Sequence, residues 1–381
     1  MTGQFQLTDD QLAIQEMAQR FTADNITPHA AEWDETHHFP REVIKQTGEL
    51  GFGAIYVSED SGGIALGRLE AALIMEAMAY GCPATSAFIS IHNMAAWMID
   101  TFGSQELKDR YLPDLVTMDK LASYALTEPA SGSDAAALKT SARLDGDHYV
   151  VNGTKQFISG SGVNDVYVVM VRTGEHKTRG ITCLVVDKDT PGVSFGAPEK
   201  KLGWNASPTA QLIFEDARVP VANRVGEEGE GFRFAMAGLD GGRLNIGACS
   251  LGGAQRCLDE AIVYTKERQQ FGQPVADFQN TQFMLADMAT ELEAARALLY
   301  LAAAKVTANA PDKTRFSAMA KRLATDSGSN VVNNALQLFG GYGYLKDYPI
   351  ERFWRDLRVH SILEGTNQVM RMIVGRDLLK D

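Results

Sequence analysis

The spacing of apolar side chains changes twice along the chain and divides it into three zones. In residues 1–120 the spacing is helical: Ile14, Met17 and Phe21 share one face. Thr8, with a glutamine three residues later, predicts a capping box before this helix. Further helices are predicted over 40–51, 67–80, 83–102 and 104–116. The first zone is therefore expected to be all-helical.

Residues 121–222 carry β-type patterns. Asp145-Gly146 and Asn152-Gly153 both lie between β-prone residues and predict hairpin turns. The segments VYVVMVRT, GITCLVVDK and TAQLIFEDARV follow as strands. Because no helix-length pattern intervenes, we expect antiparallel strands in a small barrel or sandwich.

Long helices return in residues 223–381, over 231–266, 278–305, 312–338 and 350–379. In the second of these, the apolar seam is Leu285, Met288, Leu292, Ala295 and Leu299. Four long helices predict a four-helix bundle. The chain is thus expected to be an α+β multidomain protein.

Composition and net charge indicate which kinds of partner to expect. The 381 residues are 45% hydrophobic and carry a formal net charge of -12, so we expect a globular protein without nucleic acid as its main partner. No apolar run is long enough to predict a membrane span. Met1 runs into a polar segment with no signal core. We therefore expect a cytoplasmic (bacterial) protein, or a mitochondrial matrix protein whose presequence has been removed.

Common motifs for other chemistries are missing from the sequence. There is no GxGxxG, HExxH or GxSxG, and Arg68 follows Gly67 where a phosphate-binding loop needs lysine. The four cysteines form no CxxC pair, and of the seven histidines His37 and His38 are adjacent while the rest are scattered, so we expect neither a disulfide framework nor a metal site.

Three segments combine chemical groups with small residues, and each has two interpretations. The loop 124–134 presents hydroxyls and backbone N–H groups to a polar ligand, or is an ordinary turn. Glycines within 337–344 allow close approach to a flat or anionic group, or form a helix cap. Glu364, beside two large apolar residues, is a general base with a raised pKa, or a solvated glutamate at a helix end.

Four motifs, in this order and spacing, resemble the signatures of the acyl-CoA dehydrogenase family: YALTEPASGSD, ERQQFG, LQLFGGYGY and ILEGTNQVMR. The resemblance covers essentially the whole chain. It implies an N-terminal helical domain over 1–120, a middle antiparallel β-barrel over 121–222 and a C-terminal four-helix bundle over 223–381.

The chemistry implied by the resemblance is α,β-dehydrogenation of an acyl-CoA thioester with FAD as cofactor. Glu364 would remove the α-proton, and the β-hydrogen would leave as hydride to the flavin. The backbone N–H of Glu364 would polarise the thioester carbonyl, and Gly365 would allow close approach of the chain.

Motif positions also imply which residues contact the ligands. The flavin contacts would be Tyr124, Leu126, Thr127, Gly132, Ser133, Phe157, Ile158, Ser159, Thr366 and Gln368. Contacts to the FAD of a neighbouring subunit or to its ADP part would be Arg268, Phe271, Gln279, Gln337, Leu338, Gly340 and Gly341. Substrate contacts would be Ser133, Asp240, Gly241, Arg243 and Arg376. For Arg243, an intrahelical ion pair with Asp240 is the alternative.

The segments FISGSG, GLDGGR and ILEGTNQVMR are most similar to those of members that act on a short branched acyl group, so isobutyryl-CoA from valine degradation is the expected substrate. A preference for 2-methylbutyryl-CoA or a short straight-chain acyl-CoA is the alternative, because one methylene is worth only ~1–3 kcal/mol. An acyl-CoA oxidase on this fold also remains open, whereas the presence of Glu364 and of the flavin-facing residues argues against a non-catalytic scaffold. The expected partners are an electron-transfer flavoprotein as electron acceptor and further copies of the chain in a homotetramer.

Overall fold

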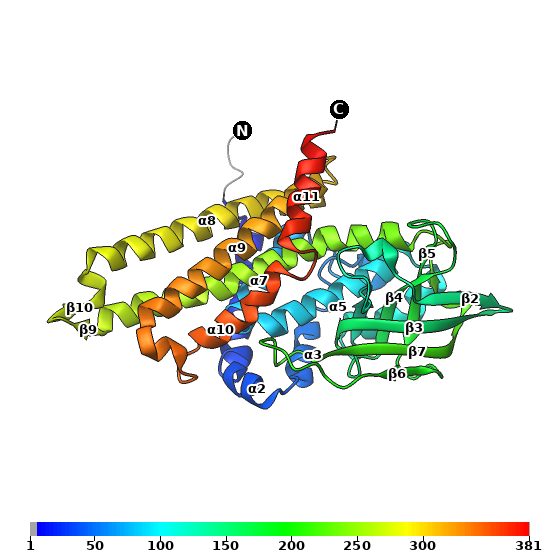
Figure 1. The fold of residues 1–381 in the computed structure, drawn as a ribbon, viewed down its shortest axis with the longest axis horizontal. Helices are drawn as coiled ribbons and strands as arrows, with labels where there is room; N and C mark the ends of the chain where they lie inside the picture. Colours follow the sequence, from blue (N-terminus) through cyan, green and yellow to red (C-terminus); the bar gives the residue numbers. More distant parts are fainter. Residues whose placement is uncertain (1–5, 381) are drawn as a thin grey trace.

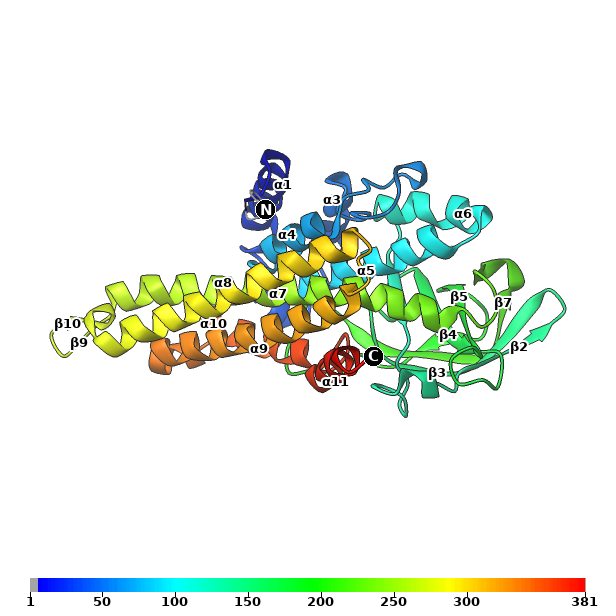
Figure 2. The same ribbon diagram turned by 90° about the horizontal axis from the view of Figure 1, so that it is seen from above.

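The computed structural model describes residues 6–380. The polar start of the chain, on which the absence of a signal peptide was predicted, lies largely outside this range. The molecule is elongated, with the β-sheet at one end and the β9–β10 hairpin at the other (Figure 1). The long helix Gly231–Glu267 runs from the hairpin to the sheet, two further long helices lie beside part of it, and the N-terminal helices lie along one side of them (Figure 2). The boundaries at residues 120 and 222 stay predictions.

The N-terminal helices follow the apolar periodicity closely. They are α1 (Asp9–Phe21), α2 (Ala30–Thr36), α3 (Arg41–Glu49), α4 (Arg68–Ala79), α5 (Pro83–Phe102) and α6 (Gln105–Val116). The capping box at Thr8 is confirmed, and Ser104 caps α6 by accepting from the N–H of Leu107. Helix α2 and the π-helical turn Thr22–Ile26 were not predicted, because both are too short to show a period.

The middle of the chain forms one sheet in the order β6-β7-β3-β2-β4-β5-β8, with β1 added beside β4. Its strands are β1 (Ala122–Ala125), β2 (Ser141–Asp145), β3 (His148–Ser159), β4 (Val166–Arg172), β5 (Ile181–Asp187), β6 (Val193–Phe195), β7 (Thr209–Pro220) and β8 (Arg224–Val225). Among residues 6–380 the two edge strands, β6 and β8, do not pair with each other, so a closed barrel is not confirmed. The expectation of purely antiparallel pairing is wrong: β1 runs parallel to β4.

Only one of the two predicted hairpin turns is a turn. Asp145 pairs with His148 across the β2–β3 hairpin, as predicted. Asn152-Gly153 instead lies inside β3 at a register shift against β7, and Gly153 has a φ of 142°. A Cβ on Gly153 would lie 2.7 Å from the Cα of Thr140. The glycine therefore serves a close backbone approach at a bulge.

The C-terminal part contains α7 (Gly231–Glu267), α8 (Gln279–Thr307), α9 (Lys313–Phe339), α10 (Ile350–Leu357) and α11 (Asn367–Leu378), with the short strands β9 (Gln269–Gln270) and β10 (Gln273–Pro274) between α7 and α8. The seam of α8 is confirmed, since Met288, Leu292 and Leu299 are buried. The continuous helix expected over 350–379 is wrong. It is interrupted between α10 and α11, where Glu364 and Gly365 have φ values of 55° and 87°.

The contacts between the parts decide where Glu364 lies. Helices α4 and α5 both pack against α7, and β1 packs against α5. Helix α9 packs against α7 and also carries α11. The turn before α11 is thereby brought to α7, close to the β1 end of the sheet. In the described part of the chain no helix is long and apolar enough to cross a membrane.

Candidate active site

The carboxylate of Glu364 lies against the backbone of α7. A Cβ on Gly242 would overlap with Oε2 of Glu364 and lie 3.1 Å from its Cδ. Oε2 is buried, although the residue as a whole is partly exposed, and within residues 6–380 it has no hydrogen-bond partner. Only a glycine at 242 admits the carboxylate to this position.

Burial raises the pKa of Glu364 to about 7, although the cations Arg243 and Lys321 act in the opposite direction. Tyr124 faces the same carboxylate: burial, and next the charge of Glu364, raise the pKa of its phenol well above the usual value. The hydroxyl of Tyr124 and Nε of Arg243 are buried without partners in the described range. Glu364, Tyr124 and Arg243, called the centre below, therefore each have a buried polar atom that can form a hydrogen bond with a ligand.

The predicted substrate residues of α7 are placed around this centre, but not as free ligands. Arg243 donates to Oδ1 of Asp240 at 2.7 Å, and Thr314 donates to Oδ2 at 2.7 Å. The intrahelical ion pair that was the alternative for Arg243 is thus formed. Gly241 packs on the guanidinium of Arg68, whose Cζ lies 3.7 Å from the ring centroid of Tyr56. Arg376, the remaining predicted substrate residue, is exposed on α11.

Two predicted flavin segments lie side by side. The N–H of Gln156 donates to the oxygen of Thr127 at 2.8 Å, and the hydroxyl of Ser123 donates to the oxygen of Ser159 at 2.7 Å. A register shift between Lys155 and Ile158 turns Phe157 outward, where 64% of it is exposed at a φ of 59°. Leu126 and Ile158 are buried, Tyr124, Thr127 and Ser159 are partly exposed, and Gly132 and Ser133 are exposed.

A buried ion pair supports the first of these segments and was missed in the sequence. Nζ of Lys155 lies 2.8 Å from Oε1 of Glu128 and also donates to the oxygen of Leu126 at 3.1 Å. Glu128 additionally accepts from the backbone N–H groups of Lys139 and Thr140. Lysine in a β-prone segment gave no local signal that its side chain points inward.

The predicted ADP-contacting residues gather at the far end of the long helices. Arg268, Leu338, Gly340 and Gly341 line one surface pocket of about 460 Å³ together with Tyr342. The guanidinium of Arg268 lies 5.4 Å from the ring centroid of Tyr342. A Cβ on either glycine would meet nothing within 4 Å, so the backbone here is open to a ligand.

The other predicted cofactor residues are more scattered. Phe271 is 95% exposed at the tip of the β9–β10 hairpin, and Gln279 is the first residue of α8. Gln337 is exposed on the last turn of α9, and Gln368 is exposed on α11. Thr366 caps α11 by accepting from the N–H of Val369 at 3.2 Å. That structural use of its hydroxyl was not predicted.

The residues present fit a flavin dinucleotide in chemical terms. The Thr127 and Ser133 hydroxyls form no hydrogen bond in the described range, and the backbone of Thr127 is hydrogen-bonded to Gln156, the residue before the exposed Phe157. The distal pocket offers a guanidinium for phosphate oxygens and aromatic rings for a base. Most of α7 separates Arg243 from Arg268, which at 1.5 Å per residue is about 37 Å. The distal pocket of one chain therefore lies far from its own centre at Glu364.

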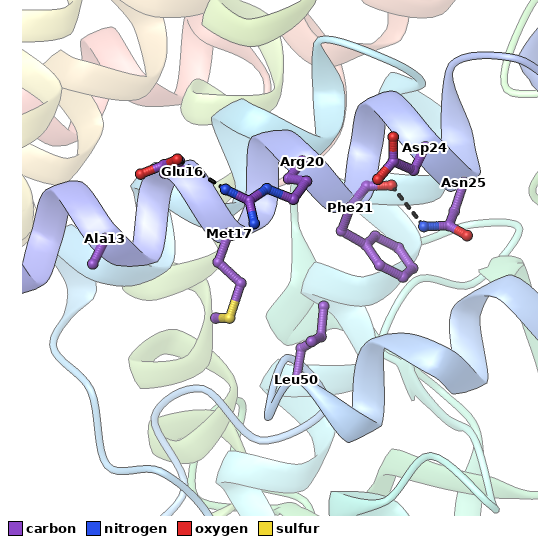
Figure 3. A pocket seen from close by; sticks show the side chains of 8 residues that line it. All are labelled: Ala13, Glu16, Met17, Arg20, Phe21, Asp24, Asn25 and Leu50. Carbon is purple, nitrogen blue, oxygen red and sulfur yellow. Dashed lines mark hydrogen bonds and ion pairs between the residues drawn. The ribbon is translucent and has the colours of Figure 1, made fainter.

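A second groove lies on the N-terminal helices and contains none of the predicted site residues. Figure 3 shows its lining from α1, the π-helical turn and Leu50, including Met17, Phe21 and the ion pair between Glu16 and Arg20. It does not contribute to the centre at Glu364.

Comparison with known proteins places the chain in a family. Residues 8–119, 123–217 and 229–379 match the models for the N-terminal, middle and C-terminal domains of acyl-CoA dehydrogenase. The chain therefore belongs to the acyl-CoA dehydrogenase family. The mitochondrial isobutyryl-CoA dehydrogenase of Dictyostelium discoideum is 57% identical over 376 residues, 98% of this chain and 90% of that protein.

Two solved structures are also similar over nearly their whole length. Butyryl-CoA dehydrogenase from Megasphaera elsdenii superposes with a TM-score of 0.96 at 38% identity, covering 99% of this chain and 100% of that one. PigA with FAD and proline superposes with a TM-score of 0.95 at 31% identity, covering 99% of both chains.

Proposed function

We propose that this protein is an FAD-dependent acyl-CoA dehydrogenase that converts isobutyryl-CoA to methacrylyl-CoA in valine degradation. The observation that carries the proposal is the buried Oε2 of Glu364, held against Gly242 with a pKa of about 7. A carboxylate with a pKa near neutrality is suited to accept a proton from carbon and to release it again.

In this proposal Glu364 removes the α-proton of the thioester while the β-hydrogen leaves with its electron pair. FAD, when bound, supplies the acceptor for that hydride. The N–H of Glu364 has no acceptor among residues 6–380, so it is free to donate to the thioester oxygen as negative charge develops there. Burial excludes water from the carboxylate and strengthens both interactions.

The chain would hold the cofactor through two sites on different copies. Leu126, Thr127, Ser133, Phe157 and Ile158 would hold the flavin end. Arg268 and the Gly340-Gly341 turn of a neighbouring copy would hold the ADP end, because the two sites of one chain lie too far apart. This division supports the proposal of an oligomer, with a homotetramer as the expected form.

The electron acceptor and the compartment are also proposals. An electron-transfer flavoprotein would reoxidise the reduced cofactor. A cytoplasmic location in a bacterium, or the mitochondrial matrix after loss of a presequence, is the expected compartment.

The test is an anaerobic visible spectrum of the purified protein before and after isobutyryl-CoA is added. Rapid bleaching of an oxidised flavin spectrum is expected. A flavin that stays oxidised would refute isobutyryl-CoA as substrate, and protein purified without flavin that binds none would refute the cofactor. Oxygen consumption with substrate would instead indicate an oxidase.

A short straight-chain substrate is the second candidate, favoured by the likeness to butyryl-CoA dehydrogenase. 2-Methylbutyryl-CoA is a related possibility. Comparing the rates of bleaching by isobutyryl-CoA, 2-methylbutyryl-CoA and butyryl-CoA ranks these substrates directly.

A further inference from the structure

The turn that carries Glu364 has a backbone conformation that needs outside support. Glu364 and Gly365 are consecutive left-handed residues, with φ values of 55° and 87°. A non-glycine residue keeps this conformation only where its surroundings hold it. The turn itself contributes little, since Ile362 and Leu363 both donate to Val359 on the preceding side.

Lys321 of α9 stabilises the turn through two hydrogen bonds. Its Nζ donates to the oxygen of Gly365 at 2.8 Å and to Oδ1 of Asn367 at 2.9 Å. The side chain is fully buried. The ammonium is thus hydrogen-bonded to the residue immediately after Glu364 and to the first residue of α11.

The neighbours of Asn367 fix the direction of this contact. Nδ2 of Asn367 donates to Oγ1 of Thr325 at 2.9 Å and to Oδ1 of Asp326 at 2.6 Å. With its nitrogen held by α9, the amide oxygen points toward Lys321. One turn of α9 therefore positions the start of α11 and the turn before it.

Both acceptors of the Lys321 ammonium are neutral oxygens. Buried charges are normally paired with an opposite charge. Within residues 6–380, Lys321 forms no ion pair with a carboxylate. Its charge is therefore not cancelled by a direct partner and acts on Glu364.

We propose that Lys321 is a positioning residue that holds the Glu364-Gly365 turn and sets the pH at which Glu364 becomes a base. The inference rests on the proposed function, in which Glu364 removes the α-proton. Lys321 does not touch the reacting atoms; it acts through the backbone of the turn and through its charge.

The charged and titratable groups around Glu364 come from four sides. Arg243 on α7 is paired with Asp240, Lys321 lies on α9, and Tyr124 on β1 and Tyr56 near α3 face the carboxylate. Arg243 and then Lys321 lower the pKa of Glu364, against the larger effect of burial.

Lys321 has its own charged neighbours. Burial lowers the pKa of Lys321 to about 8, and the charge of Arg243 adds to this, while Glu364 and Asp326 oppose it. His360 also lies within the field of Lys321, and burial lowers the pKa of that histidine to about 3, so it is neutral. Lys321 is therefore still mostly charged at neutral pH, and removing its charge raises the pKa of Glu364.

The experiment is the pH dependence of anaerobic flavin reduction by isobutyryl-CoA in the holoenzyme. Lys321→Met removes the charge and keeps most of the side-chain volume. We expect the rising limb of the rate to move up by about one pH unit. The plateau at high pH should fall about tenfold, because the turn loses its support.

Lys321→Gln is the second variant, since its shorter polar side chain is better tolerated if the methionine protein does not fold. It lacks the charge but keeps an N–H donor, so we expect the same pH shift with a smaller loss at the plateau. Lys313→Met is the control, because Lys313 lies in the first turn of α9 and donates to Asn309 at the surface.

A wild-type midpoint in a folded, flavin-containing Lys321 variant would overturn the inference and leave the proposed function intact. A shift of similar size in Lys313→Met would also overturn it, because it would then not depend on the buried site. Failure of the wild-type flavin to bleach with any short acyl-CoA is a separate outcome, which refutes the proposed function and this inference with it.

Discussion

The centre at Glu364 and the distal pocket at Arg268 contain the two groups of predicted ligand residues, and they are built in opposite ways. At the centre, polar atoms of Glu364, Tyr124 and Arg243 are buried without hydrogen-bond partners in the part of the chain that the structure describes. At the distal end the pocket is open to solvent, and Phe271 is 95% exposed. Polar atoms are buried at the centre, whereas an apolar side chain is exposed at the distal end.

This contrast indicates what each region lacks. A buried polar atom without a hydrogen bond costs about 1–3 kcal/mol, which a substrate carbonyl or cofactor hydroxyl can recover on binding. An exposed phenylalanine is stabilised when another surface covers it. The centre is therefore suited to small polar groups of a ligand, and the distal end to a ligand together with a second copy of the chain.

Removing the base gives the largest expected effect and tests the centre directly. Glu364→Gln keeps the shape of the side chain but cannot accept a proton from carbon. We expect flavin reduction by isobutyryl-CoA to slow by about 10³-fold or more, with unchanged flavin content. Near-normal turnover in single-turnover kinetics would remove Glu364 from the mechanism.

Gly242→Ala tests whether the tight packing of the centre matters. The new methyl group would overlap with Oε2 of Glu364 and displace the carboxylate. A misplacement of about 1 Å predicts a loss of about 10²-fold in turnover. Gly238→Ala, one turn earlier, is the matched control: the atoms nearest to its Cβ would belong to the flexible side chains of Met94 and Met98, at 3.4 Å. Equal rates in both variants would contradict the assignment.

At the distal end, the corresponding change should affect cofactor retention and leave chemistry intact. Arg268→Ala removes the one cation that lines the pocket among residues 6–380. We expect about tenfold weaker FAD binding, read as flavin lost on dialysis, with activity restored by excess FAD. Lys266→Ala, an exposed cation in the same turn, should retain its flavin. Full occupancy of Arg268→Ala would show that the pocket does not bind the cofactor.

A change of pH separates the two regions without any mutation. Since the pKa of Glu364 is about 7, the base is protonated below that pH and active above it. The rate of flavin reduction should therefore rise about tenfold per pH unit below 7 and level off above it. Flavin retention, which depends on an arginine, should not change over pH 6 to 8. A flat rate profile would count against the buried base.

Local pattern predicted most helices, because an amphipathic helix repeats its apolar positions over several turns. The seam of α8 is of this kind, and the capping box of α1 was predicted separately from Thr8 and the glutamine three residues later. The pattern was misleading where backbone geometry departs from the repeat. Asn152-Gly153 has the composition of a turn, yet the neighbouring chain at Thr140 makes it a bulge.

The sequence by itself determined the family, the position of Glu364 and the groups available for flavin and phosphate, because these are carried by short motifs with characteristic residue types. Only the tertiary structure decided that the last long helix breaks at Glu364, that Gly242 admits its carboxylate, and that Lys321 holds the turn from a position 44 residues before Gly365. The physical reason is that burial and left-handed backbone depend on contacts between distant segments, which no local pattern of apolar and polar residues encodes.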